Sequence, residues 1–278
     1  MSTSDSFEVH AYGCNIQLAA TCPEAHSILE RYAFPLFPEN PAHSHANLRT
    51  NPGTSKPDQP DLFLRIVQVA DQYQLLSDGA VVASALRPIA LVPDLIRVLD
   101  DAILHHLATT TLRAVHAGAV LWQERILLLP GSSHAGKSSL VAEFLRRGAT
   151  YFSDEYALID PEGCVHPYPR PLLLRDGSPE QFPILAAEWH APVGRAPAPV
   201  GWIFFLEYAP GTHWDIAPIS QSEALLTLLR NTPHALADTP DLVDPFLRAV
   251  TGATCYAGRR PDAAEAANQI LRLIDRPI

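Results

Sequence analysis

The chain has 278 residues, of which 47% are hydrophobic and 18% are charged, and its formal net charge is -10. A chain of this length can bury a substantial core and form one large domain or two small ones. The negative charge argues against broad nucleic-acid binding, because a phosphate backbone is met by a basic surface.

Neither a membrane span nor a disulfide framework is predicted. Apolar runs such as 203–206 are far shorter than the roughly 20 residues that a span needs, and the chain start lacks the basic and apolar regions of a secretory signal. The cysteines are widely scattered and form no CxxC pair or Cys/His cluster: Cys14, Cys22, Cys164 and Cys255. We therefore expect cytoplasmic residence, in a reducing compartment that supplies ATP.

The first part of the chain, residues 1–112, predicts a small α+β region. Residues 39–61 are rich in proline and turn formers and predict a long exposed loop. His43 and His45 in this loop have no carboxylate or cysteine neighbours, which favours solvated side chains over a metal-ligand pair. Residues 62–69, 73–76 and 80–86 predict an antiparallel β region with a tight turn at Asp78-Gly79. Apolar spacing over 93–107 predicts an amphipathic helix.

The second part, residues 113–278, predicts an α/β domain with its site at the strand ends. The pattern is strand, short turn, strand, glycine-rich loop, helix and strand. The strands are expected over 115–122, 126–129, 151–152, 156–159 and 202–206, and the helices over 138–147, 222–229 and 262–274. Residues 186–200 are rich in proline and alanine and predict an irregular excursion.

A phosphate-binding loop pattern follows the strand over 126–129. It reads Gly131-x-x-x-x-Gly136-Lys137-Ser138. In such loops the backbone N–H groups face the phosphates, the lysine reaches the β- and γ-phosphates, and the hydroxyl ligates Mg²⁺. The expected nucleotide-binding residues are Gly131, Ser132, Ser133, His134, Ala135, Gly136, Lys137, Ser138 and Ser139. The alternative is a glycine-containing turn with an incidental lysine.

Two adjacent acids, Asp154 and Glu155, end a short strand after the loop helix. In an extended segment neighbouring side chains point to opposite sides, so one acid can face a metal and the other an incoming nucleophile. Phosphoryl transfer needs a metal on the phosphates and a group that accepts the hydroxyl proton. A surface acid pair at a strand end is the alternative.

These motifs resemble the kinase domain of HPr kinase/phosphorylase in order and spacing over roughly residues 113–175. The matching segments are His116-Ala117-Gly118-Ala119-Val120, 127–140, Arg146-Arg147-Gly148 and Ser153-Asp154-Glu155. The resemblance implies a P-loop kinase domain of the PEP-carboxykinase-like type. It extends to the HPr-kinase-like branch of modified-peptide pathways, which includes lasso-peptide kinases that phosphorylate a peptide serine.

The resemblance also implies roles for individual residues. Asp154 matches the catalytic carboxylate, Glu155 the metal-associated acid, and His116 the histidine that positions the catalytic acid, while Lys137 and Ser138 keep their phosphate and Mg²⁺ roles. The chain departs from the family at Glu155, where aspartate is usual, and at His134, where many relatives have glycine.

Three further charged residues have two interpretations each. Arg170 and Arg175 can stabilise the transferring phosphoryl or hold an acidic substrate, or they can be solvated arginines beside a strand. Glu207, after the strand over 202–206, imitates the metal-side acid of ATPases, and an exposed terminal acid is the interpretation we favour.

The expected function is ATP-dependent transfer of the γ-phosphoryl to a hydroxyl, with Mg²⁺, onto a serine of a peptide or small protein. The alternatives are a small-metabolite kinase, a phosphoserine phosphorylase and a nucleotide-binding regulatory module. Residues 1–112 do not resemble the N-terminal domain of HPr kinase, which makes HPr itself a doubtful acceptor. Because HPr kinases are oligomers, the resemblance also raises the expectation of a homo-oligomer.

Overall fold

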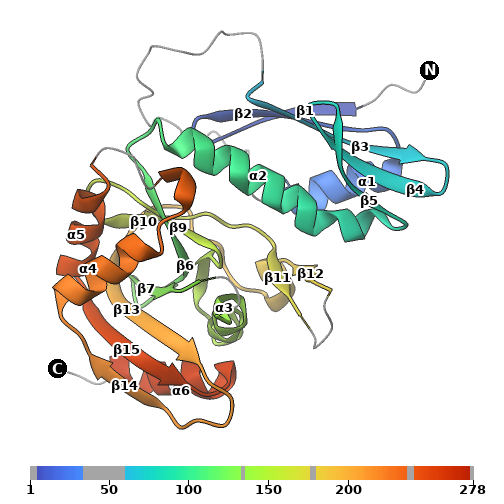
Figure 1. The fold of residues 1–278 in the computed structure, drawn as a ribbon. Helices are drawn as coiled ribbons and strands as arrows, with labels where there is room; N and C mark the ends of the chain where they lie inside the picture. Colours follow the sequence, from blue (N-terminus) through green and yellow to red (C-terminus); the bar gives the residue numbers. More distant parts are fainter. Residues whose placement is uncertain (1–4, 34–59, 133–134, 176–179, 237–240, 276–278) are drawn as a thin grey trace. The chain divides into compact units, whose positions relative to one another are not determined.

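The computed structural model describes residues 5–33, 60–132, 135–175, 180–236 and 241–275 (Figure 1). It is a mixed α/β protein with several sheets. Contacts divide the chain into two units: an N-terminal unit (Met1–Thr111 with Arg175–Pro183) and a C-terminal unit (Leu112–Leu174 with Ile184–Ile278). The expected loop over 39–61, with His43 and His45, lies almost wholly outside the described residues.

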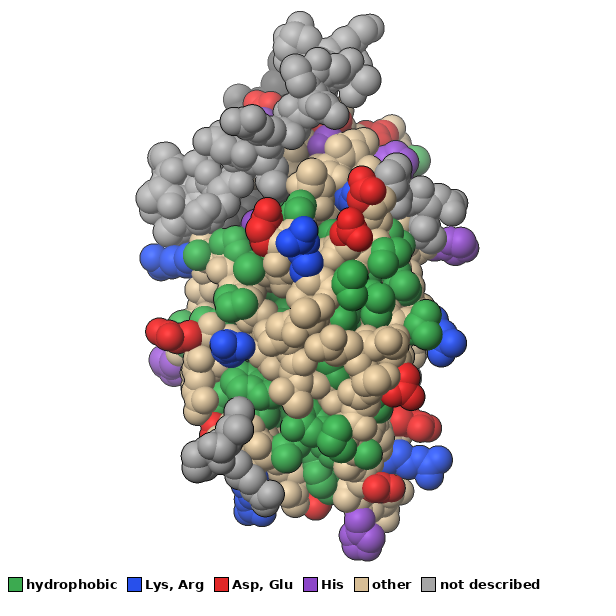
Figure 2. Space-filling model, turned by 90° about the vertical axis from the view of Figure 1, so that its left-hand side faces the viewer, with side chains coloured by type: hydrophobic (Ala, Val, Ile, Leu, Met, Phe, Trp, Pro, Cys, Tyr) green, Lys and Arg blue, Asp and Glu red, His purple; other side chains and the backbone are tan. Residues whose placement is uncertain are grey.

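The described surface carries no large basic patch on the face drawn in Figure 2. There the Lys and Arg side chains lie singly or in small groups among acidic and hydrophobic ones. Among the helices that the structure describes, none has both the length and the apolar character to cross a membrane. All four cysteines are free thiols.

The N-terminal unit is built on a five-stranded sheet in the order β1-β2-β3-β4-β5. The strands are β1 (Asp5–Ala11), β2 (Cys14–Ala20), β3 (Leu62–Val69), β4 (Gln72–Ser77) and β5 (Ala80–Ala85). Strands β2 and β3 are parallel, and the other neighbours are antiparallel. The predicted turn joins β4 to β5, with positive φ at both Asp78 and Gly79, as a tight two-residue hairpin requires.

Two helices cover one face of this sheet. They are α1 (Pro23–Ile28), continued by a π-helical turn (Leu29–Ala33), and α2 (Val92–Leu107), preceded by a short 3₁₀ turn (Pro88–Leu91). The helix predicted over 93–107 is confirmed as α2, and its apolar stripe is buried. Ile16, Leu18, Leu64 and Ile66 from β2 and β3 have no exposed surface and provide the matching sheet face.

The C-terminal unit has an eight-stranded sheet ordered β10-β9-β6-β7-β13-β15-β14, with β8 also paired to β6. Its strands are β6 (Arg113–Trp122), β7 (Arg125–Pro130), β8 (Thr150–Ser153), β9 (Tyr156–Ile159), β10 (Cys164–His166), β13 (Ala198–Tyr208), β14 (Asp215–Pro218) and β15 (Thr254–Arg260). Strand β10 pairs with both β9 and β13, so the sheet curls back on itself. Two short strands are β11 (Leu172–Leu174), which ends directly before the segment that belongs to the N-terminal unit, and β12 (Phe182–Ile184), which begins within the last residues of that segment.

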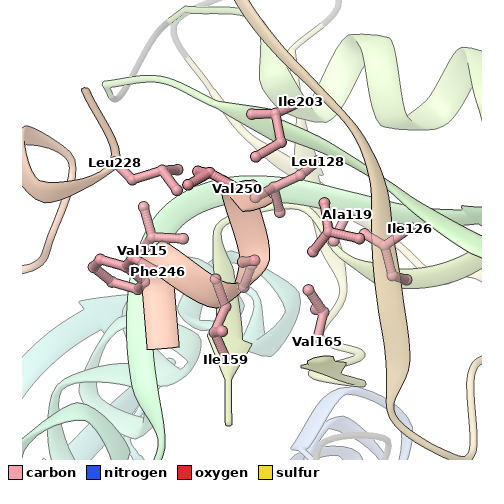
Figure 3. Packing of buried hydrophobic residues seen from close by; sticks show 14 of the residues in the cluster. Val115, Ala119, Ile126, Leu128, Ile159, Val165, Ile203, Leu228, Phe246 and Val250 are labelled. Atoms are coloured by element: carbon pink, nitrogen blue, oxygen red, sulfur yellow. The ribbon is translucent and has the colours of Figure 1, made fainter. Parts of the chain in front are cut away.

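Two cores form on the two sides of the curled sheet. Apolar side chains from β6, β7, β9, β10 and β13 converge on α4 (Gln221–Arg230) and α5 (Val243–Thr251), where Leu228, Phe246 and Val250 are buried (Figure 3). On the other side, α3 (Lys137–Arg146) and α6 (Ala263–Ile274) bury Val141, Phe144 and Ile270. The helices predicted over 138–147, 222–229 and 262–274 are thus confirmed, and each end agrees within one residue.

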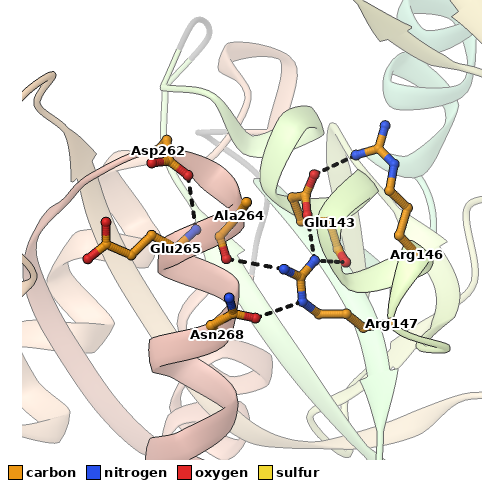
Figure 4. A network of polar contacts seen from close by, with 7 residues as sticks. All are labelled: Glu143, Arg146, Arg147, Asp262, Ala264, Glu265 and Asn268. Atoms are coloured by element: carbon orange, nitrogen blue, oxygen red, sulfur yellow. Dashed lines mark hydrogen bonds and ion pairs between the residues drawn. The ribbon is translucent and has the colours of Figure 1, made fainter.

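Arg147 joins the last turn of α3 to α6 (Figure 4). Its Nε donates to Asn268 Oδ1 at 3.1 Å, and Nη2 donates to the Ala264 carbonyl at 3.2 Å. Its Nη1 donates to the Glu143 carbonyl at 2.7 Å and also contacts the Glu143 carboxylate. Because backbone carbonyls accept two of these bonds, the arginine holds the two helix backbones at a defined spacing, in addition to pairing with the Glu143 charge.

The excursion predicted over 186–200 ends earlier than expected. It contains a short 3₁₀ turn (Ala186–Trp189), but β13 already begins at Ala198. The first residues of β13 pair with β10, and later ones pair with β7 and β15. The sequence predicts no strand at 198–201 because prolines stand at 197 and 199, and proline is uncommon in sheet interiors.

Gly118 on β6 generates a stability prediction. A Cβ atom there would lie 2.6 Å from Val141 Cγ2 of α3, which is closer than packed carbon atoms approach. We expect Gly118→Ala to reduce the free energy of unfolding by about 1–3 kcal/mol through overpacking. The penalty should shrink when Val141→Ala is combined with it, as a double-mutant cycle by urea unfolding would show.

Gly252→Ala is the matched control, because a Cβ at 252 would meet nothing closer than 3.8 Å. A Gly118→Ala protein that unfolds at the wild-type urea midpoint would contradict the packing argument.

Candidate functional site

Strand β6 brings the glycine-rich loop and the acid pair together. On one side it pairs with β7, where Ala117 lies opposite Pro130, and the Gly131 N–H donates to the His116 carbonyl at 3.1 Å. On its other side it pairs with β8 and β9, the strands that flank Asp154 and Glu155. The loop and the acids, separated along the chain by α3, therefore lie on either side of one strand.

The acid pair interrupts an otherwise continuous strand. Ala119 lies opposite Ser153 and His116 opposite Tyr156, so the end of β8 and the whole of β9 share one register along β6, whereas the pairing of Tyr151 and Thr150 is shifted by a bulge between Ala119 and Val120. Between β8 and β9 the chain bends, and the Ser153 hydroxyl accepts hydrogen bonds from the N–H groups of Glu155 (3.3 Å) and Tyr156 (3.2 Å). The extended geometry assumed for the two acids is thus replaced by a bend, and their side chains have different surroundings.

Asp154 is fully buried and only half satisfied. Its Oδ1 accepts from Arg170 Nε at 3.2 Å and lies 3.0 Å from the Tyr151 hydroxyl. Its Oδ2 has no hydrogen-bond partner among the residues that the structure describes, although buried carboxylate oxygens are nearly always satisfied. The Tyr151 hydroxyl also lies 2.8 Å from the Arg170 carbonyl, so its single proton serves one of these two acceptors at a time. Tyr151 and Arg170 therefore orient the carboxylate through one oxygen and leave the other, which is buried, unbonded by them.

Glu155 lies beside His116. Its Oε1 is 3.4 Å from His116 Nδ1, a distance suited to an ion pair but too poorly directed for a hydrogen bond. Burial raises the pKa of Glu155, but the neighbouring His116 ring and the positive charges of Lys137 and Arg170 outweigh it and hold the pKa below its ordinary value. The carboxylate is thus kept ionised.

The histidine is placed differently from the expectation. We expected His116 to position Asp154, but the structure puts it against Glu155, and its ring packs on Tyr156 at a centroid distance of 4.6 Å. The reason is the register: His116 lies directly opposite Tyr156, and the bend turns the preceding residue toward the same ring.

Lys137 is buried at the start of α3. Its Nζ donates to the carbonyls of Gly131 and Ser132, both at 3.0 Å, so the side chain folds back across the loop. Burial lowers the pKa of Lys137, and Arg170 lowers it further, whereas Glu155 and Asp154 act in the opposite direction. The lysine, the two acids and Arg170 therefore share one electrostatic environment.

The loop has the backbone of a helix N-terminus that can face an anion. Gly136 caps α3 with φ +76°, a left-handed conformation that glycine adopts without strain. Ser138 and Ser139 lie in the first helical turn, where backbone N–H groups have no acceptor within the helix. Ser133 and His134 lie outside the described residues, and Gly131, Ser132 and Ala135 complete the described part of the loop.

The remaining candidates separate clearly. Arg170 is buried and contacts Asp154, so it is not a solvated arginine. Arg175 is exposed and belongs by its contacts to the N-terminal unit. Glu207 is 74% exposed and pairs with Arg259 at 3.8 Å, in agreement with the terminal surface acid that we favoured.

Two residues of the site had no sequence signal of their own. Tyr151 was assigned only to a strand, and Arg260 ends β15, which was not predicted. The buried Arg260 donates from Nη2 to the carbonyls of Ala135 and Gly136 in the glycine-rich loop. Arg260 ends a short strand and belongs to no motif that predicts a contact with the loop, so the sequence could not assign it there.

The site offers oxygen atoms of the type that Mg²⁺ prefers as ligands. The Ser138 hydroxyl and the ionised Glu155 carboxylate are oxygen ligands, and Mg²⁺ on a nucleotide is held by one or two such groups together with phosphate oxygens and water. The pKa of Glu155, held low by its surroundings, supports this role because a ligand carboxylate must be deprotonated.

Neither a protein-family model nor a curated protein matches this sequence. Among solved structures, the chain is similar to the HPr(Ser) kinase/phosphatase from Coxiella burnetii, with a TM-score of 0.31 and 14% identity. That similarity covers 58% of this chain and 93% of the other.

The lowered pKa of Glu155 generates a pH prediction. The folded state favours the ionised form of Glu155 more than the unfolded chain does, and this preference stabilises the fold. The stabilisation is complete above the ordinary glutamate pKa of 4.5 and is lost as the pH falls through the lower pKa of the folded state. Glu155→Gln cannot titrate. The difference in unfolding free energy, wild type minus variant, should therefore decrease as the pH is lowered from 7 to 3.5 in urea unfolding experiments.

The exposed Glu162 provides the control, because Glu162→Gln should leave this pH dependence close to that of the wild type. A difference between wild type and Glu155→Gln that is flat, or that grows toward acid pH, would reverse the sign that we assign.

Proposed function

We propose that the protein is an ATP-dependent phosphotransferase that moves the γ-phosphoryl group to a hydroxyl, with a serine of a peptide or small protein as the acceptor class. The observation that carries the proposal is the meeting of three groups around β6: the Lys137 amine on the glycine-rich loop, the buried Asp154, and the ionised Glu155. Phosphoryl transfer requires this combination of phosphate binding, metal binding and proton acceptance.

The loop binds the nucleotide phosphates in this proposal. Lys137 exchanges its contacts with the Gly131 and Ser132 carbonyls for the β- and γ-phosphate oxygens, and the N–H groups at the start of α3 face the same anion. Ser138 and Glu155 would hold Mg²⁺, which neutralises charge on the phosphates. His116 limits the positions open to the Glu155 carboxylate.

Asp154 acts as the general base. The acceptor hydroxyl donates its proton toward Oδ2, which no described residue binds, while Tyr151 and Arg170 hold Oδ1. The Arg170 guanidinium, which we had considered for direct phosphate contact, acts here on the base through its Nε. The base is thereby presented to the acceptor in one orientation.

One observation favours a second candidate, a nucleotide-binding regulatory module. Asp154 has no exposed surface, so an acceptor reaches it only if neighbouring residues move. In a regulatory module the same movement would report the nucleotide state, and hydrolysis would be slow and independent of any acceptor. The metabolite kinase and the phosphorylase differ from the main proposal only in the acceptor or in the direction of the reaction.

The first test offers Mg·ATP, labelled on the γ-phosphate, with a panel of serine-containing peptides to the wild type and to Lys137→Ala. We expect label in at least one peptide with the wild type, and a loss of most transfer in the variant because the positive charge that contacts the β- and γ-phosphates is removed. Unimpaired transfer by Lys137→Ala at saturating ATP would remove the loop from the site. Acceptor-independent, slow release of phosphate with no labelled peptide would favour the regulatory module.

Asp154→Asn tests the base. The amide keeps the size of the side chain but cannot take the proton, so transfer should fall by about 10²- to 10⁴-fold while Mg·ATP binding is retained. Single-turnover rates and calorimetric binding on the same preparation separate the two effects. Glu155→Gln should instead weaken the dependence on Mg²⁺, and an interchange of the two phenotypes would exchange the roles of the acids.

A further inference from the structure

Arg260 contacts the glycine-rich loop from the end of β15. Its Nη2 donates to the carbonyls of Ala135 and Gly136, both at 3.1 Å, and the residue is only 3% exposed. The two carbonyls belong to consecutive peptide units directly before α3. One guanidinium thus binds the last turn of the loop.

The arginine itself is fixed on several sides. Its Nη1 donates to the Pro261 carbonyl at 3.0 Å, and the guanidinium carbon lies 5.0 Å from the centre of the Tyr208 ring. Tyr208 lies opposite Arg260 in the parallel ladder of β13 and β15, and the Ala209 N–H donates to the Arg260 carbonyl at 3.1 Å. The guanidinium therefore has one defined position against the loop.

The loop is shaped to receive this arginine. Gly136 has φ +76°, and a Cβ atom at this position would collide with Nη2 of Arg260. Glycine at 136 is thus favoured by its backbone conformation, and its lack of a side chain leaves room for the guanidinium.

The contact helps to set where the loop N–H groups point, together with the first hydrogen bond of α3, in which the Leu140 N–H donates to the Gly136 carbonyl at 3.2 Å. A trans peptide unit is planar, and its C=O and N–H point in opposite directions. The described peptide bonds include no cis bond. When Arg260 binds the carbonyls of Ala135 and Gly136, the N–H groups of Gly136 and Lys137 must point away from the arginine. These are two of the N–H groups that would face a phosphate in a loop of this kind.

We propose that Arg260 is a positioning residue for phosphate binding: it binds the outer, carbonyl side of the loop and thereby directs the N–H groups of Gly136 and Lys137 toward the nucleotide. This inference rests on the proposed nucleotide binding. Lys137 must leave the Gly131 and Ser132 carbonyls to reach a phosphate, whereas Arg260 can keep its contacts throughout. The arginine holds the loop in place while the lysine moves.

The experiment compares Arg260→Gln and Arg260→Lys with Arg259→Gln in the full-length chain. Arg259 is the matched control, since it is adjacent, 64% exposed and paired with Glu207 on the surface. Three quantities are measured: the Kd for Mg·ATP, amide hydrogen exchange of residues 131–139 without nucleotide, and the melting temperature. We expect Arg260→Gln to weaken ATP binding about tenfold or more and to speed exchange in the loop selectively. For Arg260→Lys both effects should lie between those of the wild type and Arg260→Gln, because an ammonium group cannot bind two carbonyls as the planar guanidinium does. Arg259→Gln should match the wild type.

The outcomes are separable. Wild-type affinity and wild-type loop exchange in Arg260→Gln would overturn the proposal, as would a lower melting temperature with exchange increased evenly across the protein, since the arginine would then be only structural. If the wild type itself does not bind ATP, the proposed function fails, and the loop exchange rates still decide whether Arg260 orders the loop.

Discussion

Strand β6 is hydrogen-bonded on both edges, and the site depends on this double pairing. On one edge is β7, which leads into the glycine-rich loop, and on the other are β8 and β9, which flank the acid pair. Neighbouring strands lie about 4.8 Å apart, so groups at the same level of β7 and of β8 and β9 cannot be far from one another. Gly118 on this strand has no side chain and lets α3 pack closely, which places Lys137 over the same region.

The buried charges of the site are tolerated because acidic and basic side chains lie close to one another. Burying an isolated charge is costly, and here two acids share a region with Lys137 and Arg170. The balance is uneven: Glu155 is surrounded by positive groups and keeps its charge, whereas the charged form of Lys137 is disfavoured by burial and favoured by the acids. The charged form of such a buried lysine is stabilised when a polyanion binds, because the phosphate oxygens supply negative charge that the protein provides only in part.

Part of the fold and the glycine-rich loop of the site could be predicted because their residues are close in sequence and carry a pattern. Three features follow from local sequence alone: the loop pattern, the amphipathic helix over 93–107 and the Asp78-Gly79 turn. The hairpin of β1 and β2 was not recognised, although Tyr12 and Gly13 form its turn with positive φ. Strand β15 and helix α5 were not recognised either, because their apolar runs are short and their burial depends on distant elements.

The partners within the site could not be derived from the sequence. Whether His116 contacts Asp154 or Glu155 depends on a bend at residues 154 and 155 and on a strand register, neither of which composition specifies. The same holds for Arg170, which a sequence pattern cannot distinguish from a solvated arginine but which is buried on Asp154. Long-range contacts of this kind link residues that only the completed sheet brings together.

The two cations on the glycine-rich loop have different consequences. Lys137 comes from the loop's own helix and binds carbonyls that it can exchange for phosphate oxygens, so its position depends on the ligand. Arg260 comes from another strand and is held by Tyr208 and the Pro261 carbonyl, so its position depends on the fold. A loop held only by its own lysine would lose its contacts at the moment of binding and incur the cost of ordering then. With a second cation anchored elsewhere, the direction of the loop N–H groups is set before the nucleotide arrives, which is the condition for tight binding of an anion by backbone groups.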